Sequence, residues 1–336
     1  MTILITGSAG FIGSCLIHYI LSEKTDVSVV GIDNLSGGYM TNMPIESDRF
    51  HFCQMNTEDD SLADIFERYT PDIVYHMSAY AAEGLSPFMR RYTVNSNMMA
   101  TANVINCCIN YNVKRLVYTS SMSVYGDGIE GECFDEDLTP HPLDPYAISK
   151  YACELDIQSA SRTHGLEYCI IRPHNVYGIR QNIWDTYRNV LAIWMMQYLN
   201  GEPLTIYGTG EQTRAFSYID DMLEPLWKAG VSNKARNQII NLGGMHGISI
   251  KDACMTMCKV LDPTGTVSYE YKEPRYEVRH AVPTYEKSVE LLGYHENISM
   301  EEGLKTMWRW VKGQPKRERF HWDKYEVEKG IYSYWK

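Results

Sequence analysis

The sequence has little that would hold it on nucleic acid or a membrane. Acidic residues outnumber basic ones by 42 to 31, and the formal net charge of −11 disfavours binding to a phosphate backbone or an anionic lipid surface. No run of about 18 apolar residues is present, so no transmembrane helix is expected. A small anionic ligand is still compatible with this charge, because a few local arginines suffice to bind it.

Metal-binding and disulfide patterns are also missing. The nine cysteines form no CxxC pair and no cluster with histidine at metal-ligand spacing. Cys254 and Cys258 lie one helical turn apart in an apolar stretch, which is typical of reduced thiols in a core. Residues 1–6 enter an apolar run without the basic segment of a signal peptide. We therefore expect a cytoplasmic protein with neither disulfides nor a bound metal ion.

What is present begins with a glycine-rich turn. An apolar run at 2–6, typical of a buried parallel strand, precedes Gly7, Gly10 and Gly13, and a helix-periodic stretch follows at 14–21. A tight strand-to-helix turn needs residues without a Cβ, and a pyrophosphate must approach the N–H groups at the positive end of the helix. In this context the pattern predicts a dinucleotide-binding turn.

Asp33 indicates which dinucleotide binds. It ends a second strand-like run at 27–32 and lies twenty residues after Gly13. A carboxylate at that place accepts hydrogen bonds from the adenosine ribose and repels a 2′-phosphate. No Arg or Lys follows directly, so the sequence favours NAD over NADP. The alternative is that Asp33 only caps a turn.

Strands and helices alternate along the first half of the chain. Strand-like runs at 72–79, 115–121 and 168–173 are separated by helical stretches at 61–69, 95–110 and after 146. This alternation predicts an α/β protein with a Rossmann-type doubly wound parallel sheet.

The same pattern suggests how the chain is divided. We assign 1–173 mainly to an NAD-binding domain and 174–313 mainly to a smaller C-terminal substrate-binding lobe interleaved with returning sheet elements. Residues 314–336 form a tail, expected to be a solvated helix that lays Phe320 and Trp322 on the body.

Tyr146 and Lys150 are the candidate catalytic pair. Their spacing places both on one face of a helix, and a nearby ammonium lowers the pKa of a phenol that ordinarily titrates near ~10. Serines at the end of the run 115–121 would meet the pair beside the cofactor, which supplies the groups needed to move a proton off a substrate hydroxyl. Alone, this spacing also occurs on ordinary helix surfaces.

A series of motifs places the pair in a family. They are Thr6-Gly7-x-x-Gly10-x-x-Gly13, Asp33-Asn34-Leu35, His76-x-x-Ala79, Ser120-Ser121-x-x-Val124-Tyr125-Gly126, Pro145-Tyr146-x-x-Ser149-Lys150, Arg172-x-x-Asn175-Val176-Tyr177-Gly178 and Arg214-x-Phe216-x-Tyr218-x-Asp220-Asp221. With these motifs in order from residue 2 to residue 310, the chain resembles the extended short-chain dehydrogenase/reductases, the NAD-dependent nucleotide-sugar epimerase/dehydratase family. It is most similar to the UDP-glucose 4-epimerase-like branch.

The resemblance implies roles for single residues. Tyr146 would take the proton of the substrate 4-hydroxyl, Lys150 would bind the nicotinamide ribose, and Ser121 would bridge the 4-oxygen and Tyr146. Asn56 stands where many relatives carry an Asp, and Ala81 stands where some 4-epimerases carry a Lys. The residues implied to bind NAD are Gly7, Gly10, Phe11, Ile12, Gly13, Asp33, Asn34, Asn56, Ala79, Tyr146 and Lys150.

The resemblance also implies a nucleotide-sugar substrate, which in this branch is a UDP-sugar, and no nucleic-acid partner. Arg214 and Arg275 are candidates for its diphosphate, because a guanidinium binds phosphate in a planar, bidentate way. The alternative for each arginine is a surface ion pair. The residues implied to bind substrate are Ser121, Ser123, Asn175, Asn189, Tyr207, Arg214 and Arg275.

The residues after Ser121 distinguish the reactions of the family. Its 4,6-dehydratases place Asp-Glu there, its decarboxylases usually a Glu and its 3,5-epimerases a Cys, whereas this chain has Met122 and Ser123. A Met cannot transfer a proton and an ordinary Ser is a poor acid or base, so the sequence favours 4-epimerisation. Dehydration, decarboxylation, 4-keto reduction and a non-catalytic NAD-binding role stay as alternatives. By analogy with the family, helices at 95–110 and 146–164 would pair in a homodimer.

Overall fold

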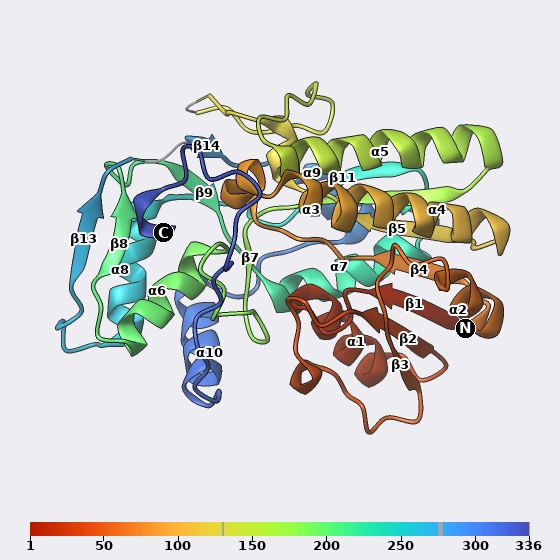
Figure 1. Cartoon of the computed structure of the whole chain (residues 1–336), viewed down its shortest axis with the longest axis horizontal. Helices are drawn as coiled ribbons and strands as arrows, with labels where there is room; N and C mark the ends of the chain where they lie inside the picture. Colours follow the sequence, from red (N-terminus) through yellow and green to blue (C-terminus); the bar gives the residue numbers. More distant parts are fainter. Residues whose placement is uncertain (130, 275–277, 336) are drawn as a thin grey trace.

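A seven-stranded parallel sheet forms the centre of the molecule (Figure 1). The structure, a computed structural model, describes residues 1–129, 131–274 and 278–335. The strand order β11-β6-β5-β4-β1-β2-β3 is that of a doubly wound sheet, so the predicted fold class is confirmed. The strands are β1 (Thr2–Thr6), β2 (Ser28–Asp33), β3 (Phe50–Gln54), β4 (Ile73–His76), β5 (Arg115–Thr119), β6 (Glu167–Pro173) and β11 (Gln238–Leu242).

Both faces of this sheet are covered by helices, because its strands carry apolar side chains on both sides. Ile3 and Ile5 of β1 belong to one core cluster, whereas Leu4 between them belongs to a second. The first cluster includes side chains of α1 (Phe11–Glu23), α7 (Ile219–Val231) and α9 (Glu286–Leu292). The second includes side chains of α2 (Leu62–Tyr69), α4 (Ala100–Asn110) and α5 (Pro145–His164).

A smaller lobe of short sheets lies beside the carboxyl ends of these strands (Figure 1). Among the described residues it contains three small sheets. Two of them are strand pairs: β7 (Val176–Tyr177) with β10 (Ser217–Tyr218), and β8 (Leu204–Tyr207) with β13 (Tyr269–Lys272). In the third, β9 (Thr213–Ala215) lies between β12 (Gly247–Ser249) and β14 (His280–Ala281). Its helices are α6 (Val190–Leu199), α8 (Ile250–Leu261) and α10 (Met300–Lys312). Since β11 returns to the main sheet after β10, the chain passes between the two lobes more than once.

Several short elements carry the connections. They are the single turns η1 (Met40–Asn42), η2 (Glu83–Phe88), η4 (Met122–Tyr125), η5 (Asn233–Ala235) and η6 (Ser333–Trp335), the helix α3 (Arg90–Thr93) and the π-helical η3 (Val94–Met99). The helix expected at 95–110 therefore begins earlier, at Arg90, and includes a π turn that apolar periodicity does not reveal. Helix α6 begins at Val190, because the Asn189 side chain caps it by accepting a hydrogen bond from the Leu191 N–H at 3.0 Å.

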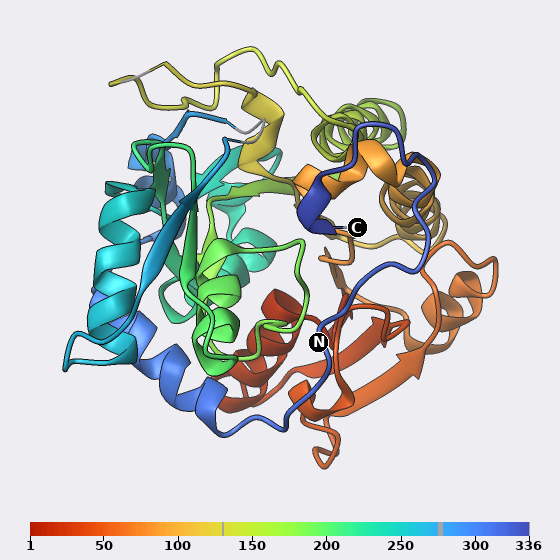
Figure 2. The ribbon, with the colours of Figure 1, turned by 60° about the vertical axis from the view of Figure 1, so that its left-hand side comes forward.

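The tail after α10 is not the helix that we predicted. Figure 2 shows it, in dark blue, leaving α10 as an irregular strand that crosses to the η2 side of the molecule. The Phe320 N–H donates to the Trp184 carbonyl at 2.8 Å, and the Trp322 indole donates to the Tyr80 hydroxyl at 2.9 Å. An extended chain lets these aromatic side chains reach both lobes, which one helix face could not do.

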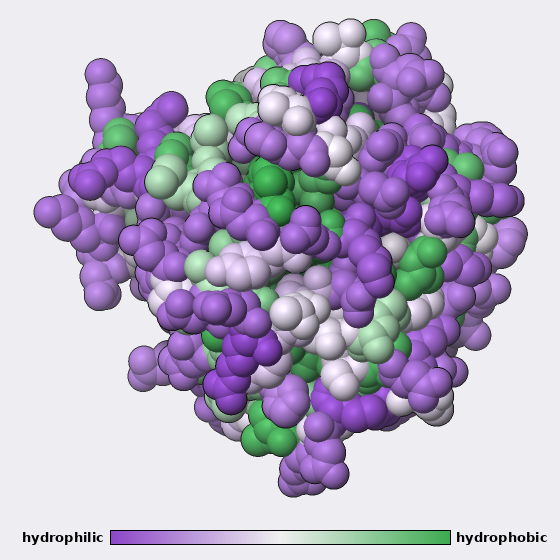
Figure 3. Space-filling model, turned by 90° about the vertical axis from the view of Figure 1, so that its right-hand side faces the viewer, coloured by the Kyte–Doolittle hydropathy of each residue, from purple (hydrophilic) through white to green (hydrophobic). Residues whose placement is uncertain are grey.

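The surface is largely polar. The face shown in Figure 3 is mostly hydrophilic, with apolar side chains in small groups. No helix within the described ranges is long and apolar enough to span a membrane. Each of the nine cysteines is a free thiol.

Two buried histidines make the fold sensitive to acid. Burial lowers the pKa of His76 and of His174 to about 3, and the charges of Lys150 and Arg172 add to the effect. The unfolded chain therefore takes up protons first as the pH falls below the ordinary value of 6.5, so stability is lost between pH 6.5 and 3 and is unaffected above 7. We expect each histidine to remove about 2 kcal/mol of unfolding free energy between about pH 7 and pH 5.

Urea unfolding of His174→Phe at both pH values measures this effect. The variant should lose less stability on acidification than the wild-type protein, by about 2 kcal/mol. Identical losses would show that the buried imidazole does not titrate as described.

Candidate functional site

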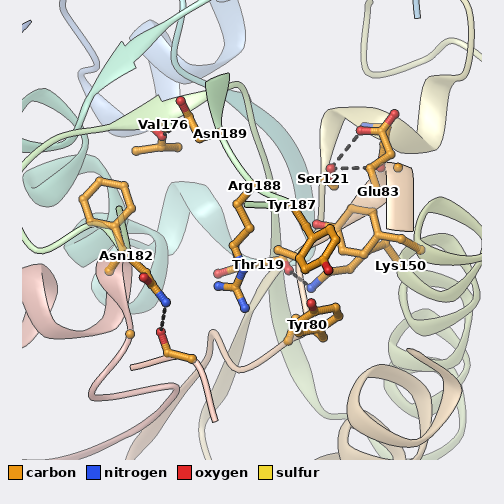
Figure 4. A pocket seen from close by; sticks show the side chains of 18 of the residues that line it. Tyr80, Glu83, Thr119, Ser121, Lys150, Val176, Asn182, Tyr187, Arg188 and Asn189 are labelled. Carbon is orange, nitrogen blue, oxygen red and sulfur yellow. Dashed lines mark hydrogen bonds between the residues drawn. The ribbon is translucent and has the colours of Figure 1, made fainter. Parts of the chain in front are cut away.

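One cavity of about 700 Å³ lies where the carboxyl ends of the sheet strands meet the smaller lobe. Figure 4 shows it from close by. The predicted site residues that line it are Gly7, Gly10, Phe11, Ile12, Gly13, Asp33, Asn34, Ala79, Ser121, Ser123, Tyr146, Lys150, Asn175, Asn189, Tyr207 and Arg214. Asn56 is not among the lining residues, but its side-chain oxygen accepts a hydrogen bond from Asn34 at 2.9 Å. Arg275 lies outside the described residues.

The glycine turn is as tight as its sequence predicts. The Gly7 φ is +71°, and a Cβ on Gly13 would lie 2.2 Å from the Gly7 carbonyl oxygen, so no side chain fits there. The Gly10 N–H donates to that same carbonyl at 3.1 Å. The turn therefore brings backbone directly to the start of α1 and leaves open the space in front of the helix, where a pyrophosphate can approach.

Asp33 closes the turn at the end of β2. Its two carboxylate oxygens accept hydrogen bonds from the backbone N–H groups of Ala9, at 3.0 Å, and Leu35, at 2.7 Å. The carboxylate also lines the cavity, and each oxygen can accept a further hydrogen bond. Asp33 thus holds the turn in shape and can still accept ribose hydroxyls, so the capping role and the ligand role do not exclude each other.

The beginning of α5 places Tyr146 and Lys150 in the same wall. Asp144 caps the helix by accepting a hydrogen bond from the Ala147 N–H at 3.0 Å, and Pro145 occupies the first turn. Both side chains are buried, and the Lys150 ammonium lies 5.9 Å from the centre of the Tyr146 ring. The ammonium donates to the Thr119 carbonyl at 2.7 Å, which fixes it at the end of β5.

The pKa expectation for Tyr146 is wrong. Burial raises the pKa of the Tyr146 hydroxyl, and this effect outweighs the lowering by Ser121 and Arg188. Burial also lowers the pKa of Lys150 to about 8, at which the ammonium still predominates at neutral pH. The physical reason is that both groups are removed from water together, and each then disfavours its charged form.

The two neighbouring serines have different environments. The Ser121 hydroxyl faces the cavity and accepts hydrogen bonds from the Ser123 N–H, at 3.2 Å, and the Ser123 hydroxyl, at 3.0 Å. The Ser120 hydroxyl instead donates to the buried Glu154 carboxylate at 2.5 Å. The orientation of the backbone at the end of β5 therefore makes Ser121 the serine that can reach a ligand.

Glu154 and Arg172 form a buried ion pair behind the site. The guanidinium donates twice to the carboxylate, from Nε at 2.9 Å and from Nη2 at 2.6 Å, and both side chains are at most 2% exposed. Arg172 Nη1 also donates to the Tyr125 hydroxyl at 2.8 Å. The pair thereby ties α5, which carries Tyr146 and Lys150, to β6 and to the segment after β5.

The smaller lobe contributes polar side chains that are already held in place. Arg214 donates to the Thr213 carbonyl at 2.8 Å and to the Val278 carbonyl at 2.5 Å. The Asn175 amide donates to the Ala215 carbonyl at 3.3 Å. Asn189 uses its oxygen for the cap of α6, and its amide donates to the Val176 carbonyl at 3.0 Å, as Figure 4 shows in part.

Glu83 and Arg188 are charged residues of the cavity to which the sequence assigned no individual role. Glu83 comes from η2 and lies near Ser121 (Figure 4), and its charge raises the pKa of Tyr146. Arg188 points into the middle of the cavity from the segment before α6. Glu83 lies in no motif, whereas Arg188 comes directly before Asn189, which was implied to bind substrate.

The fold and this cavity define a dinucleotide-binding protein of the doubly wound class, with a Tyr–Lys helix against the same cavity. The model of the NAD dependent epimerase/dehydratase family matches residues 3–243, and the chain belongs to that family. The expected extended short-chain dehydrogenase/reductase membership is thereby confirmed, and NAD, named by the family, is its cofactor.

Relatives in this family carry out different reactions. UDP-glucose 4-epimerase from Thermotoga maritima, solved with UDP-glucose, has a TM-score of 0.86 at 30% identity, covering 93% of this chain and 99% of that one. UDP-glucuronic acid 4-epimerase from Bacillus cereus, solved with UDP-glucuronic acid and NAD, has a TM-score of 0.85 at 28% identity and the same coverage. A dTDP-glucose 4,6-dehydratase from Haemophilus influenzae is 28% identical over 92% of this chain and 97% of its own length.

The residues of the cavity fit NAD. Gly7, Gly10 and Gly13 line the cavity, and a Cβ on Gly13 would clash with the Gly7 carbonyl and force the tight turn open. The Thr119 hydroxyl, beside Lys150 in the same wall, is buried without a hydrogen-bond partner among the described residues, so a ligand hydroxyl can satisfy it. Within the same part of the chain, no group of three or more His, Cys, Asp and Glu side chains could hold a metal ion.

Breaking the buried ion pair should lower the free energy of unfolding by several kcal/mol. Glu154→Gln keeps the shape of the side chain but leaves the Arg172 charge buried without its carboxylate, so we expect about 3–5 kcal/mol of lost unfolding free energy. Urea unfolding measures it. Glu301→Gln, which breaks an exposed pair with Lys305 on α10, is the matched control and should leave the free energy of unfolding nearly unchanged. Equal effects of the two variants would contradict the assignment.

Proposed function

We propose that this protein is an NAD-dependent 4-epimerase of a nucleotide-linked hexose, with a UDP-sugar as the substrate class. The observation that carries the proposal is the convergence of Ser121, Tyr146 and Lys150 in one wall of a cavity whose other end is the glycine turn. Residues 122 and 123 add neither a carboxylate nor a thiol at that point. This set is sufficient for oxidation at C4 and its reversal.

Tyr146 is the proton-transfer residue in this scheme. It takes the proton of the sugar 4-hydroxyl while Ser121 holds the 4-oxygen, and it returns the proton after the sugar has presented its other face. NAD, which the glycine turn, Asp33 and Lys150 would hold, would supply the acceptor for the C4 hydride and its donor in the reverse step, so the proton and the hydride that leave would both return. Since burial disfavours the phenolate, the Lys150 charge must act on Tyr146 when the site is filled.

The nucleotide is held by the smaller lobe. Arg214 supplies a guanidinium for the diphosphate. Tyr207, at the end of β8, is proposed to lie along the nucleotide base. Asn175 and Asn189, fixed by hydrogen bonds to backbone carbonyls, line the space between them and the Tyr–Lys wall. Ser123 is proposed to contact the sugar together with Ser121.

A second reaction on the same sugar is favoured by one residue. Glu83 brings a carboxylate to the Tyr146 end of the cavity, from an element far away in the sequence. A carboxylate beside a 4-keto sugar can remove the C5 proton, which is the step that an elimination of water needs. A 4,6-dehydratase is therefore the alternative candidate.

NMR of the products distinguishes the two reactions. Purified protein is mixed separately with UDP-glucose, UDP-N-acetylglucosamine and UDP-glucuronate, and the spectra are followed with time. We expect the C4 epimer of at least one sugar without added NADH. A 4-keto-6-deoxy product would select the dehydratase, and inertness toward all three sugars would contradict the proposed substrate class.

Tyr146→Phe should abolish turnover and leave the cofactor bound. The substitution removes only the hydroxyl that transfers the proton, and we expect the rate to fall by roughly 10²-fold or more. Product formation by NMR and NAD content by absorbance after denaturation are the two measurements. Retention of the full rate would exclude Tyr146 as the base.

We also propose a homodimer formed through α5 and its neighbour η3–α4. These helices expose four large apolar side chains: Val94, Met99, Ile148 and Leu155, each between 44% and 57% exposed. A second copy of the chain would cover them, as in the dimer expected from family analogy.

Light scattering after gel filtration tests the dimer. Wild-type protein should have twice the chain mass of 38.6 kDa, and Leu155→Glu should shift it toward one chain mass. Ile45→Glu, at an exposed apolar position away from these helices, is the control and should leave the mass unchanged. A wild-type mass of one chain would contradict the proposal.

A further inference from the structure

Arg188 is a cation held in the cavity wall. Its Nε lies 2.8 Å from the carboxylate of Asp185, which is 3% exposed, and its guanidinium carbon lies 5.1 Å from the centre of the Tyr80 ring. The neighbouring Tyr187 is fixed by the tail, because its hydroxyl and that of Tyr325 are 2.8 Å apart. The guanidinium is therefore positioned before any ligand arrives.

The outer nitrogens of this guanidinium point into the cavity (Figure 4). Within residues 1–129, 131–274 and 278–335, no group accepts a hydrogen bond from Nη1 or Nη2 of Arg188. Only 24% of the side chain is exposed, so water can satisfy these donors only in part. A positioned guanidinium with unused N–H groups is suited to a planar, doubly charged acceptor.

Arg188 faces the loop after β2, at Gly37 and Gly38, and this loop packs against the glycine turn. A Cβ built on Gly37 would lie 2.9 Å from Nη2, and one built on Gly38 would lie 2.7 Å from the Gly10 nitrogen. The Asn182 amide donates to the Gly37 carbonyl at 3.2 Å, which joins the 182–188 segment to the same backbone (Figure 4). The Arg188 guanidinium thus lies beside Gly37, and the positive end of α1 lies beside Gly38. An anion bound at these two glycines would be attracted by the guanidinium and by the helix end.

We propose that Arg188 binds the pyrophosphate of NAD from the smaller lobe and thereby slows release of the cofactor. The inference rests on the cofactor of the family and does not depend on which reaction the protein catalyses. A nucleotide sugar carries the same chemical group, a diphosphate ester. The position of Arg188 against Gly37 favours the dinucleotide, because Gly37 follows Asp33 on the adenosine side of the cavity.

Arg188→Met tests this proposal, because it keeps the length of the side chain and removes the charge. Dissociation constants for NAD and for UDP are measured by calorimetry on cofactor-stripped protein, and NAD content is measured after gel filtration. We expect NAD binding to weaken by roughly tenfold or more, with UDP binding unchanged within about twofold. Arg188→Lys should recover part of the NAD affinity, since it restores the charge without the planar fork.

Two controls separate this effect from others. Arg309→Met removes an exposed charge on α10 and should leave NAD binding within about twofold of wild type. The melting temperature of each variant shows that it is folded. NAD affinity that is unchanged in Arg188→Met, or a loss confined to UDP, would overturn the inference. Wild-type protein that binds NAD through Arg188 but fails to epimerise any sugar would instead contradict only the proposed reaction.

Discussion

The buried pair of Glu154 and Arg172 is the contact on which the geometry of the site depends. It joins the helix that carries Tyr146 and Lys150 to β6, and through Ser120 it also reaches the end of β5. Removing two charges from water is costly, and the attraction in a low-dielectric interior compensates only when every donor and acceptor is used. Here the carboxylate accepts three hydrogen bonds and the guanidinium donates a further one to Tyr125. The helix start is therefore held in one position relative to the strands.

The second constraint is the joining of two lobes across one cavity. The tail packs Trp322 and Trp335 against Tyr80, Tyr187 and Phe88, so rings from both lobes share one apolar cluster. The Glu326 carboxylate accepts hydrogen bonds from two backbone N–H groups of α3, which fixes the middle of the tail on that helix. A cavity built between lobes that are joined in this way can surround a dinucleotide and a nucleotide sugar together and limit the entry of water.

Burial at the site has opposing consequences. It raises the pKa of Tyr146, so the phenolate is scarce in the empty cavity, and it lowers the pKa of Lys150 to about 8, at which the ammonium still predominates at neutral pH. The same exclusion of water strengthens any charge that a ligand brings close to these groups. A base that becomes effective only when the cavity is filled would protect a reactive keto sugar from side reactions, which is consistent with a reaction that must return its own proton and hydride.

The local sequence determined those features of this protein that depend only on residues close together in the chain. The glycine turn, Asp33 at the end of β2, the strands of the main sheet and the Tyr146–Lys150 spacing all follow from conformational limits or periodicity within a few residues. Only the tertiary structure decided that the Ser120 hydroxyl is bound to Glu154 and that Glu83 and Arg188 enter the cavity. It also decided that the tail is extended and that the pKa of Tyr146 is raised instead of lowered. These properties depend on burial and on partners distant in the chain, such as Glu154 for Ser120 and Tyr80 for Trp322, and no local pattern records the desolvation or the contacts that such partners impose.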